Sequence, residues 1–417
     1  MDPTRTTHIL RTTAADNSPH PASPKAKGRM SVVVVRDLST LSGFVPAWEE
    51  LAAAALEPNV FYEHWMLLPA LEAFGGGKDI SIVLVLIHDA HNPDAPAKLG
   101  GLFPLEQIPR YKKLMVSVLS LWQHAHCYVC TPLVRADAAR ECMVELFRWL
   151  RSGGANASLL ELRCISGDGR FHKLLVDLSN ELGLRSCITD IFTRGLWRER
   201  SDKNTLTESA VPGDLRRRLR RKEKRLSERG WVEHLAMRPE DDIGRWIDEF
   251  LRVEASGWKG QRGSALASSE GDRRYFTEIA TSAFRRGRLL MLGLNFNGCP
   301  IARRCAFVAG EGSFAFKTAY DEEFADFSPG AMLEMDSIRQ LQTLAAVRWM
   351  DSCAAPDNFL VNRLSNDRKT IQSLTVGGGA LGELVVSGLP LLQWATRRIL
   401  MRSSEATAHP SAEGSRT

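Results

Sequence analysis

Glu254 is the acidic side chain whose setting most favours chemistry. It belongs to segment 240–258, whose apolar residues recur at helical spacing: Ile243, Trp246, Ile247, Phe250 and Leu251. Glu254 follows Ile243 by three helical turns, so its carboxylate projects from the same apolar face. A desolvated carboxylate there would have a raised pKa and could act as a general base, whereas a frayed helix end would leave it on the surface. Trp258 and Lys259 follow directly and would place an aromatic ring and an ammonium beside it.

Ser328, Pro329 and Gly330 mark a second candidate position. Residues 313–320 before them alternate as a strand, and an apolar stripe after them predicts a helix: Met332, Met335, Ile338, Leu341 and Leu344. Serine is a common N-cap, and proline is tolerated in the first turn. Free backbone N–H groups at such a helix start suit an anion, above all a pyrophosphate. An ordinary capped helix that binds nothing fits the same residues.

Residues 216–225 carry eight basic side chains against one glutamate. Leu215, Leu219 and Leu226 fall four and seven apart, which predicts a helix with one packed seam and a basic outer face. Nucleic acid, an anionic membrane surface or the phosphates of a cofactor could bind that face, and a merely solvated helix is the alternative. No aromatic residue is interleaved with the charges, which argues against base stacking.

Four potential zinc ligands lie close together: His124, His126, Cys127 and Cys130. Structural zinc sites usually add a second Cys/His pair about 12–20 residues away, and none follows here. We therefore expect no metal, and instead a loop that leaves strand 116–121 with its imidazoles facing a cleft.

The composition is that of a soluble globular protein with 44% hydrophobic and 25% charged residues. Its 417 residues predict two domains of about 150–200 residues each. The net charge of +5 is small for this length, so local basic runs matter more than the total. Eight scattered cysteines, no apolar segment of signal-peptide length at the N-terminus and no run of about 20 apolar residues favour a cytoplasmic protein with reduced thiols.

The element order predicts an α/β (α+β) chain. Strands are expected at 31–35, 80–87, 99–106, 116–121, 158–163 and 187–193, with helices at 44–56, 63–74, 138–151 and 170–182. The second part should hold helices 240–258 and 272–286, strands 288–296, 300–309 and 313–320 with an Asn297-Gly298 hairpin, the Ser328 helix and strand 347–351. A helix at 381–400 should pack on the second domain. We thus expect domains at 30–198 and 214–401, a linker at 199–213, and disordered tails at 1–29 and 402–417.

This order resembles a GNAT-fold acetyltransferase domain of the CelD type, a family associated with cellulose biosynthesis and distantly related to Fem-type aminoacyltransferases. The matching motifs lie at 254–260, 300–302, 316–324, 328–330 and 349–351. The resemblance is strongest over 215–365 and looser over 44–135. It implies two GNAT-like domains in tandem, each a mixed, mostly antiparallel sheet flanked by helices, with the chemistry mainly in the second.

The resemblance also implies a function. The chain would be an acyl-CoA-dependent N- or O-acyltransferase that transfers an acyl group directly to an amine or hydroxyl of a sugar, polysaccharide or other envelope-associated acceptor. Acetyl-CoA or another acyl-CoA would be the co-substrate, without a metal. The turn formed by Ser328, Pro329, Gly330, Ala331 and Met332 would hold the pyrophosphate of this donor.

Roles for single side chains follow from the same resemblance. Glu254 or Asp321 would be the base, Lys317 an electrostatic partner of the oxyanion, and Tyr320 the acid that protonates the leaving thiolate. The acceptor would lie among five residues: Trp258, Lys259, His124, His126 and Asp351. Two alternatives remain: a Fem-like aminoacyl-tRNA-dependent transferase, or a non-catalytic GNAT-like binding module of a polysaccharide synthase complex. Apart from tRNA, a nucleic acid partner is not expected, although helix 216–225 could bind an anionic partner weakly.

Overall fold

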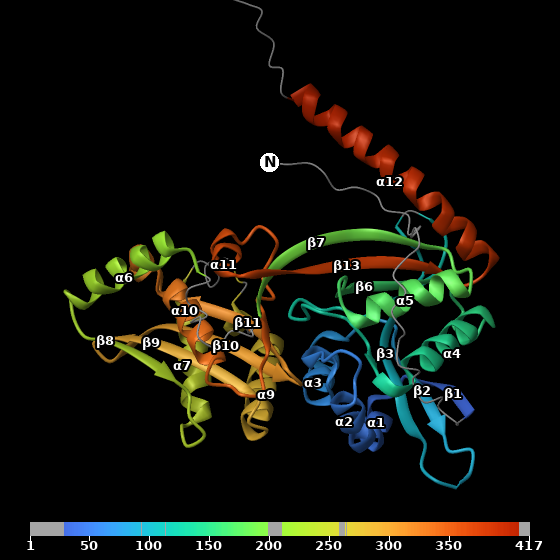
Figure 1. Cartoon of the computed structure of the whole chain (residues 1–417), viewed down its shortest axis with the longest axis horizontal. Coiled ribbons are helices and arrows are strands. Elements are labelled where there is room, and N and C mark those ends of the chain that lie inside the picture. The colour runs from blue at the N-terminus through green and yellow to red at the C-terminus, as the bar shows by residue number, and fades with distance from the viewer. Residues whose placement is uncertain are drawn as a thin grey trace, which may run out of the picture.

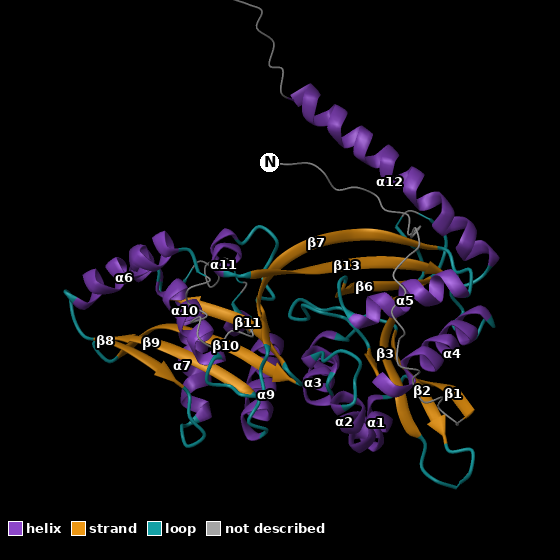
Figure 2. Ribbon diagram, viewed as in Figure 1, coloured by secondary structure: helices purple, strands orange, loops and turns teal. Residues whose placement is uncertain are grey.

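The structure is a computed structural model that describes residues 29–92, 94–112, 114–198, 211–257, 263 and 265–407. The predicted N-terminal tail up to residue 28, most of the predicted linker, and both Trp258 and Lys259 lie outside the described residues. The described strands join one sheet in the order β1-β2-β3-β4-β6-β13-β7-β12-β11-β10-β9-β8, with β5 paired to β3. Figure 2 shows this sheet passing through the whole molecule with helices on its faces.

The first half of the chain supplies seven strands and five α-helices. The strands are β1 (Arg29–Val35), β2 (Ile80–His88), β3 (Lys98–Ile108), β4 (Val118–Leu121), β5 (Leu133–Val134), β6 (Leu159–Ser166) and β7 (Ser186–Arg198). The helices are α1 (Leu38–Leu41), α2 (Val45–Ala53), α3 (His64–Phe74), α4 (Ala139–Arg151) and α5 (Arg170–Glu181), with short 3-10 turns η1 (Ser42–Phe44), η2 (Val60–Tyr62) and η3 (Ala136–Ala138). The apolar run of β2 is buried in the sheet, as such a run predicts.

The second half forms a meander with a crossover. Its strands are β8 (Val232–Ala236), β9 (Leu289–Phe296), β10 (Cys299–Ala309), β11 (Gly312–Tyr320) and β12 (Trp349–Asp351). Its helices are α6 (Gly213–Ser227), α7 (Ile243–Ser256), α9 (Glu270–Arg285), α10 (Pro329–Leu341) and α11 (Phe359–Leu364), with turns η5 (Leu266–Ser268) and η6 (Glu322–Phe327). Asn297 and Gly298 both have positive φ (49° and 77°), which confirms the predicted hairpin between β9 and β10. Strand β12 is parallel to β11 because α10 carries the chain back.

The last strand, β13 (Asp367–Gly377), returns to the first half. It pairs antiparallel with both β6 and β7. The long strands β7 and β13 arch together from one half to the other (Figure 1), and the C-terminal end of β7 pairs with β12. The sheet of the first half is therefore completed by residues that follow the second half in sequence.

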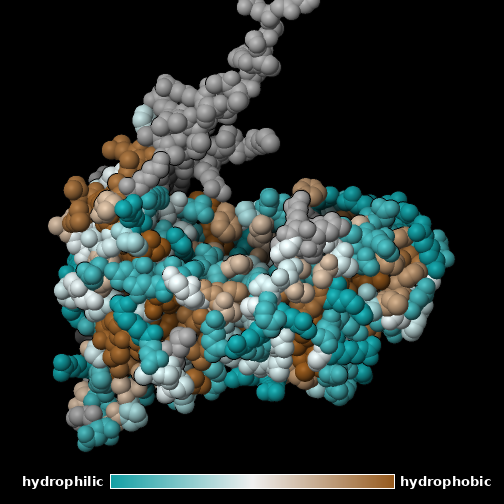
Figure 3. All heavy atoms as spheres, turned by 180° about the vertical axis from the view of Figure 1, so that it is seen from behind, coloured by the Kyte–Doolittle hydropathy of each residue, from teal (hydrophilic) through white to brown (hydrophobic). Residues whose placement is uncertain are grey.

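The C-terminal helix α12 (Ala380–Thr407) begins directly after β13. Its buried residues Val386 and Leu389 belong to a cluster with Tyr111, Val118 and Leu159 of the first half. The predicted packing of this helix on the second half is therefore wrong, because β13 carries it across the molecule. Exposed apolar side chains follow on its other side: Leu381, Leu384, Leu391, Leu392 and Trp394. Figure 3 shows brown side chains where α12 leaves the body.

The predicted fold class, a mixed and mostly antiparallel sheet flanked by helices, is confirmed. Helices α7 and α9 pack against the second-half strands, and α10 packs on β9, β10 and β11. Within the described residues, no helix combines the length and the apolar character needed to cross a membrane.

Candidate functional site

Strand β11 has a bulge at its centre. Cys305 of β10 pairs with Lys317, and the next residue, Ala306, pairs with Ala315, so Phe316 is the extra residue. A bulge twists the strand, leaves backbone groups unpaired and changes the direction of the side chains around it. Phe316 stacks on Phe276 of α9, and Lys317 donates a hydrogen bond to Glu254 of α7.

The two parallel strands β11 and β12 separate just before this bulge. They pair only through Gly312, Ser313 and Phe314 on β11. Beyond Phe314, the β12-facing edge of β11 has no strand partner among the described residues. Unpaired backbone N–H and C=O groups along a strand edge can bind an extended ligand in the manner of an added strand. We call this unpaired edge, with the bulge at Phe316, the slot; its backbone groups suit an extended, amide-containing molecule.

Glu254 and Lys317 lie beside this slot as a buried ion pair. Nζ of Lys317 is 3.2 Å from Oε1 of Glu254, and the two side chains are 12% and 0% exposed. The other oxygen, Oε2, accepts a hydrogen bond from the backbone N–H of Leu266 at 2.8 Å. As predicted from helical spacing, Glu254 projects from the buried face of α7. Both carboxylate oxygens of Glu254 thus accept hydrogen bonds from the protein itself.

His126 approaches the same slot from the first half. Its Nε2 lies 2.6 Å from Oδ1 of Asp272 in the first turn of α9. Its ring lies 6.0 Å from the ring of Phe316 and stacks on Tyr275. Burial lowers the pKa of His126, while the hydrogen bond to Asp272 and the nearby carboxylate of Glu254 act in the opposite direction. The carboxylate fixes one ring nitrogen, and Nδ1 makes no hydrogen bond with any described residue.

His124 is buried to about the same extent as His126, with exposed fractions of 8% and 7%. Phe74 stacks on its ring at 4.9 Å, and burial lowers the pKa of His124 to about 3. Its Nδ1 accepts the backbone N–H of His126 at 3.4 Å, and its Nε2 has no partner. His124 therefore shapes the loop that carries His126. The described residues hold no group of three or more His, Cys, Asp or Glu side chains arranged for a metal ion.

Asp351 of β12 pairs with Phe314 of β11 and is the centre of an ionic network. Its two oxygens each lie 2.7 Å from the guanidinium of Arg194, and Lys369 lies 3.0 Å away. The backbone N–H of Cys353 also donates to it. Asp351 is fully buried, so these groups from β7, β12 and β13 hold three strands together. Its carboxylate is occupied by the protein itself and is not presented to a substrate.

Tyr320 and Asp321 lie at the far end of β11. A Cβ on Gly330 would lie 3.3 Å from the ring of Tyr320, so this tyrosine faces α10 and not Glu254. Asp321 caps the turn η6, because its Oδ1 accepts the backbone N–H of Glu323 at 3.1 Å. The structure thus brings together Glu254, Lys317 and His126, and it keeps Tyr320 and Asp321 with the turn before α10.

Ser328 occupies the predicted N-cap position of α10, with φ 57° and ψ 54°, but its side chain makes no cap hydrogen bond. Its Oγ instead accepts a hydrogen bond from Nζ of Lys222 on α6 at 2.8 Å. The backbone N–H groups of Ala331 and Met332 both donate to the carbonyl of Ser328. Pro329 has no N–H, so only the N–H of Gly330 remains for a ligand at this helix start.

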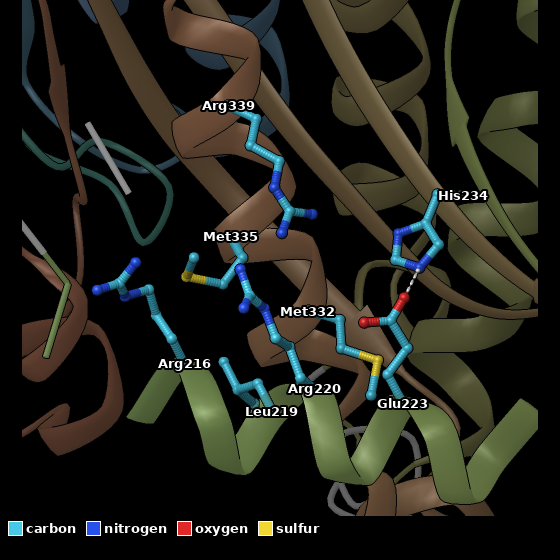
Figure 4. Close-up of a pocket in the computed structure, with 8 residues that line it drawn as sticks. All are labelled: Arg216, Leu219, Arg220, Glu223, His234, Met332, Met335 and Arg339. Carbon is cyan, nitrogen blue, oxygen red and sulfur yellow. Dashed lines mark hydrogen bonds and ion pairs between the residues drawn. The ribbon is translucent and has the colours of Figure 1, made fainter. Parts of the chain in front are cut away.

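A small pocket lies between α6, β8 and α10 (Figure 4). Its lining includes Arg216, Arg220 and Arg339; Arg220 and Arg339 extend toward Met335, whereas the guanidinium of Arg216 points away from it (Figure 4). Its volume of about 20 Å³ is close to that of one water molecule, so it does not accommodate a substrate. On one side of it, His234 bonds to Glu223 of α6, an interaction that holds α6 on the body.

Several residues of this site were not identified from the sequence. Asp272 is one acidic residue of many in an amphipathic helix, and its proximity to His126 depends on the packing of two halves. Phe316 looked like one alternating residue of a strand, because a bulge has no reliable local pattern. Arg194 and Lys369 lie on strands far apart in sequence. The sequence pointed to this region through Glu254, His126 and the motif at 316–324.

Comparisons with known proteins agree with this geometry. Residues 213–359 match the Acetyltransferase (GNAT) domain family. Curated proteins gave no match to the chain. Among solved structures, FemX is similar over 79% of this chain and 95% of its own, with 9% identity and a TM-score of 0.51. A conserved protein of unknown function from Bacteroides thetaiotaomicron VPI-5482 gives 12% identity, 80% and 97% coverage and a TM-score of 0.48.

A tandem GNAT protein from the clavulanic acid biosynthesis pathway is also similar, with 12% identity over 84% of this chain and 99% of its own, and a TM-score of 0.42. The likeness to FemX concerns the fold, since the identity is low. The domain match covers α6 to β12, and so includes the bulged strand β11, the open edge and the Glu254–Lys317 pair. Residues 213–359 of this chain are therefore similar to the acetyltransferase (GNAT) domain family.

Proposed function

We propose that the protein transfers an acyl group from an acyl-CoA directly to an amine or hydroxyl of its acceptor. The observation that carries this proposal is the open edge of β11 at the Phe316 bulge, next to the partly buried His126–Asp272 pair. The amide groups of an extended pantetheine arm suit such an edge, because they donate and accept hydrogen bonds as a peptide does. This arrangement would bring the thioester to Lys317 and His126.

In this mechanism His126 takes the proton of the attacking group. Its Nδ1 is available, its pKa is lowered by burial so that the imidazole is neutral at pH 7, and Asp272 orients the ring. The nucleophile forms a bond to the thioester carbon, the C–S bond breaks, and the CoA thiolate takes up the proton that His126 removed. Glu254 holds the ammonium of Lys317 in place, and Lys317 with the backbone N–H groups at the bulge stabilises the oxyanion.

The acceptor is proposed to be a sugar or polysaccharide precursor, on the basis of the resemblance to CelD-type domains. Two other functions predict different ligands. A Fem-like transferase would bind aminoacyl-tRNA, and a binding module would bind neither donor. We favour acetyl-CoA as the donor. The comparison of acetyl-CoA with a longer acyl-CoA in the experiment below tests which acyl chain length the protein binds.

The test is thermal unfolding with acetyl-CoA, a longer acyl-CoA and free CoA, followed by thiol release with candidate acceptors. A ligand at about 100 times its dissociation constant adds about 2.7 kcal/mol of stability. For domains of this size that corresponds to a rise in Tm of roughly 5–10 °C. Stabilisation by CoA species and acceptor-dependent thiol release are the expected results. No stabilisation by any CoA species would overturn the proposal, and stabilisation by tRNA alone would replace it with the Fem-like function.

A further inference from the structure

We propose that one side of α6 binds the phosphates of the acyl donor. This side consists of Arg218, Lys222 and Arg225 of α6, and Arg229 follows in the turn after the helix; we call these four residues the basic stripe. Spacings of four and three residues place Arg218, Lys222 and Arg225 in one row on the helix. The inference rests on the proposed use of an acyl-CoA, and it names the part of the chain that recognises the nucleotide end of that donor.

The basic stripe lies against the turn that leads from β11 into α10. Nζ of Lys222 lies 2.8 Å from Oγ of Ser328. The guanidinium groups of Arg225 and Arg229 lie 5.8 and 5.0 Å from the ring centre of Phe327. The buried seam of α6, formed by Leu215, Leu219 and Leu226, keeps the helix in this position. Lys222, Arg225 and Arg229 thus border the turn at the end of the open edge of β11.

The backbone of that turn offers few donors of its own. The N–H groups of Ala331 and Met332 donate to Ser328, and the N–H of Ser328 donates to Ala325. With Pro329 lacking an N–H, Gly330 is the single residue from 328 to 332 whose N–H remains for a ligand. One N–H cannot hold a pyrophosphate. The charge must therefore come from side chains, and the basic stripe is the nearest source on the described part of the chain.

The basic stripe has no ion-pair partner among the described residues. Of the two acidic residues of α6, Glu223 bonds to His234 and Asp214 bonds to Arg363. Like charges three and four residues apart destabilise a helix. A multiply charged anion would relieve this repulsion. The pyrophosphate and 3′-phosphate of a CoA molecule supply such an anion at the correct end of the pantetheine arm.

The test compares the affinities of CoA, 3′-dephospho-CoA and pantetheine by calorimetry, using the full chain. The variant R218A/K222A/R225A removes three charges from the basic stripe, and R217A/R221A/K224A removes three from the outward side of the same helix. We expect the stripe variant to bind CoA at least about 10-fold more weakly, since bonds to charged groups contribute about 1.5–3 kcal/mol each. The outward variant should stay within about twofold, because its charges are distant and screened.

The wild-type chain provides a second measurement that needs no variant. Its affinity should fall in the order CoA, 3′-dephospho-CoA, pantetheine, and the logarithm of the CoA affinity should fall as salt increases. Equal affinities for CoA and pantetheine, or equal losses in the two variants, would overturn the inference while leaving acyl-CoA use intact. If wild type binds no CoA species, the proposed function fails as well. Loss of RNA binding but not of CoA binding in the stripe variant would assign this side to nucleic acid.

Discussion

Asp272 and His126 form a 2.6 Å contact between residues from opposite halves of the chain. His126 lies on the loop after β4, and Asp272 lies in the first turn of α9, where Ser269 caps the helix. Neither half contains this pair alone. The proposed proton acceptor is therefore assembled only when the two halves pack, and mutations at their interface should affect catalysis as well as stability.

The His126–Asp272 pair predicts a specific pH dependence. Replacing His126 with Gln should lower kcat/KM by roughly 10²–10⁴. Replacing Asp272 with Asn should cause a smaller loss. Because the Asp272 hydrogen bond raises the pKa of His126 against the lowering by burial, its loss lowers that pKa further. The acidic limb of the pH–rate profile, where the base becomes protonated, should then move to lower pH.

A matched control for Asp272→Asn lies on the same helix. Glu278 is partly exposed and pairs with Arg274, so Glu278→Gln should leave the pH–rate profile unchanged. Full turnover in His126→Gln would rule out this histidine as the base and return the role to Glu254.

The Glu254–Lys317 pair predicts strong coupling in a double-mutant cycle. Glu254→Gln leaves the Lys317 ammonium nearly buried without its counter-charge, which should destabilise the protein by about 3–5 kcal/mol. Adding Lys317→Gln should recover about 1–3 kcal/mol of that loss. Chemical denaturation of the four proteins measures the coupling. The exposed pair Glu72–Arg274 is the control, and its cycle should give less than about 1 kcal/mol. Additive effects at Glu254 and Lys317 would contradict the buried pair.

The charged carboxylate of Asp351 should stabilise the folded protein at neutral and mildly acidic pH. Burial alone would raise the pKa of Asp351, but Arg194 and Lys369 more than offset this and hold it below its usual value of 3.8. Its contribution is therefore present above pH 3.8 and is lost as the pH falls through the lower, folded-state pKa. Asp351→Asn should cost about 3–5 kcal/mol near neutral pH, because Arg194 is left buried without a counter-charge.

Melting temperatures between pH 2 and 7 measure this effect. The difference between wild type and Asp351→Asn should shrink toward the acidic end. Asp357→Asn, at an exposed position nearby in the chain, should follow wild type throughout. A constant difference at all pH values would mean that the carboxylate charge is not what stabilises the network.

His234 predicts a stability loss at alkaline pH. Hydrogen bonds to Asp336 and Glu223 raise the pKa of His234 to about 9. The contribution of this group is complete below the unfolded-state value of 6.5 and is lost as the pH rises through about 9. Since His234 joins α6 to β8 and α10, melting temperatures of wild type should fall between pH 7 and 10 more steeply than those of His234→Gln. His91→Gln, on an exposed loop, should behave as wild type.

The sequence by itself determined most of the local structure. The β9–β10 hairpin follows from Asn297 and Gly298, since few other residues adopt positive φ in succession. The buried position of Glu254 follows from the 3.6-residue period of α7, and the connection from β11 to α10 follows from the strand period and Pro329. Each of these features depends on residues close together in the chain, so a local pattern can encode them.

Only the tertiary structure decided which groups meet. The position of β13 between β6 and β7, the contact of His126 with Asp272, and the network of Asp351 with Arg194 and Lys369 all join distant segments. Ser328 shows the same dependence: Lys222 of another helix donates a hydrogen bond to its hydroxyl, which makes no cap hydrogen bond in α10. Hydrogen bonds and ion pairs depend on distances of a few ångströms between side chains, and the packing of the sheet sets those distances, whereas the period of a single helix or strand does not.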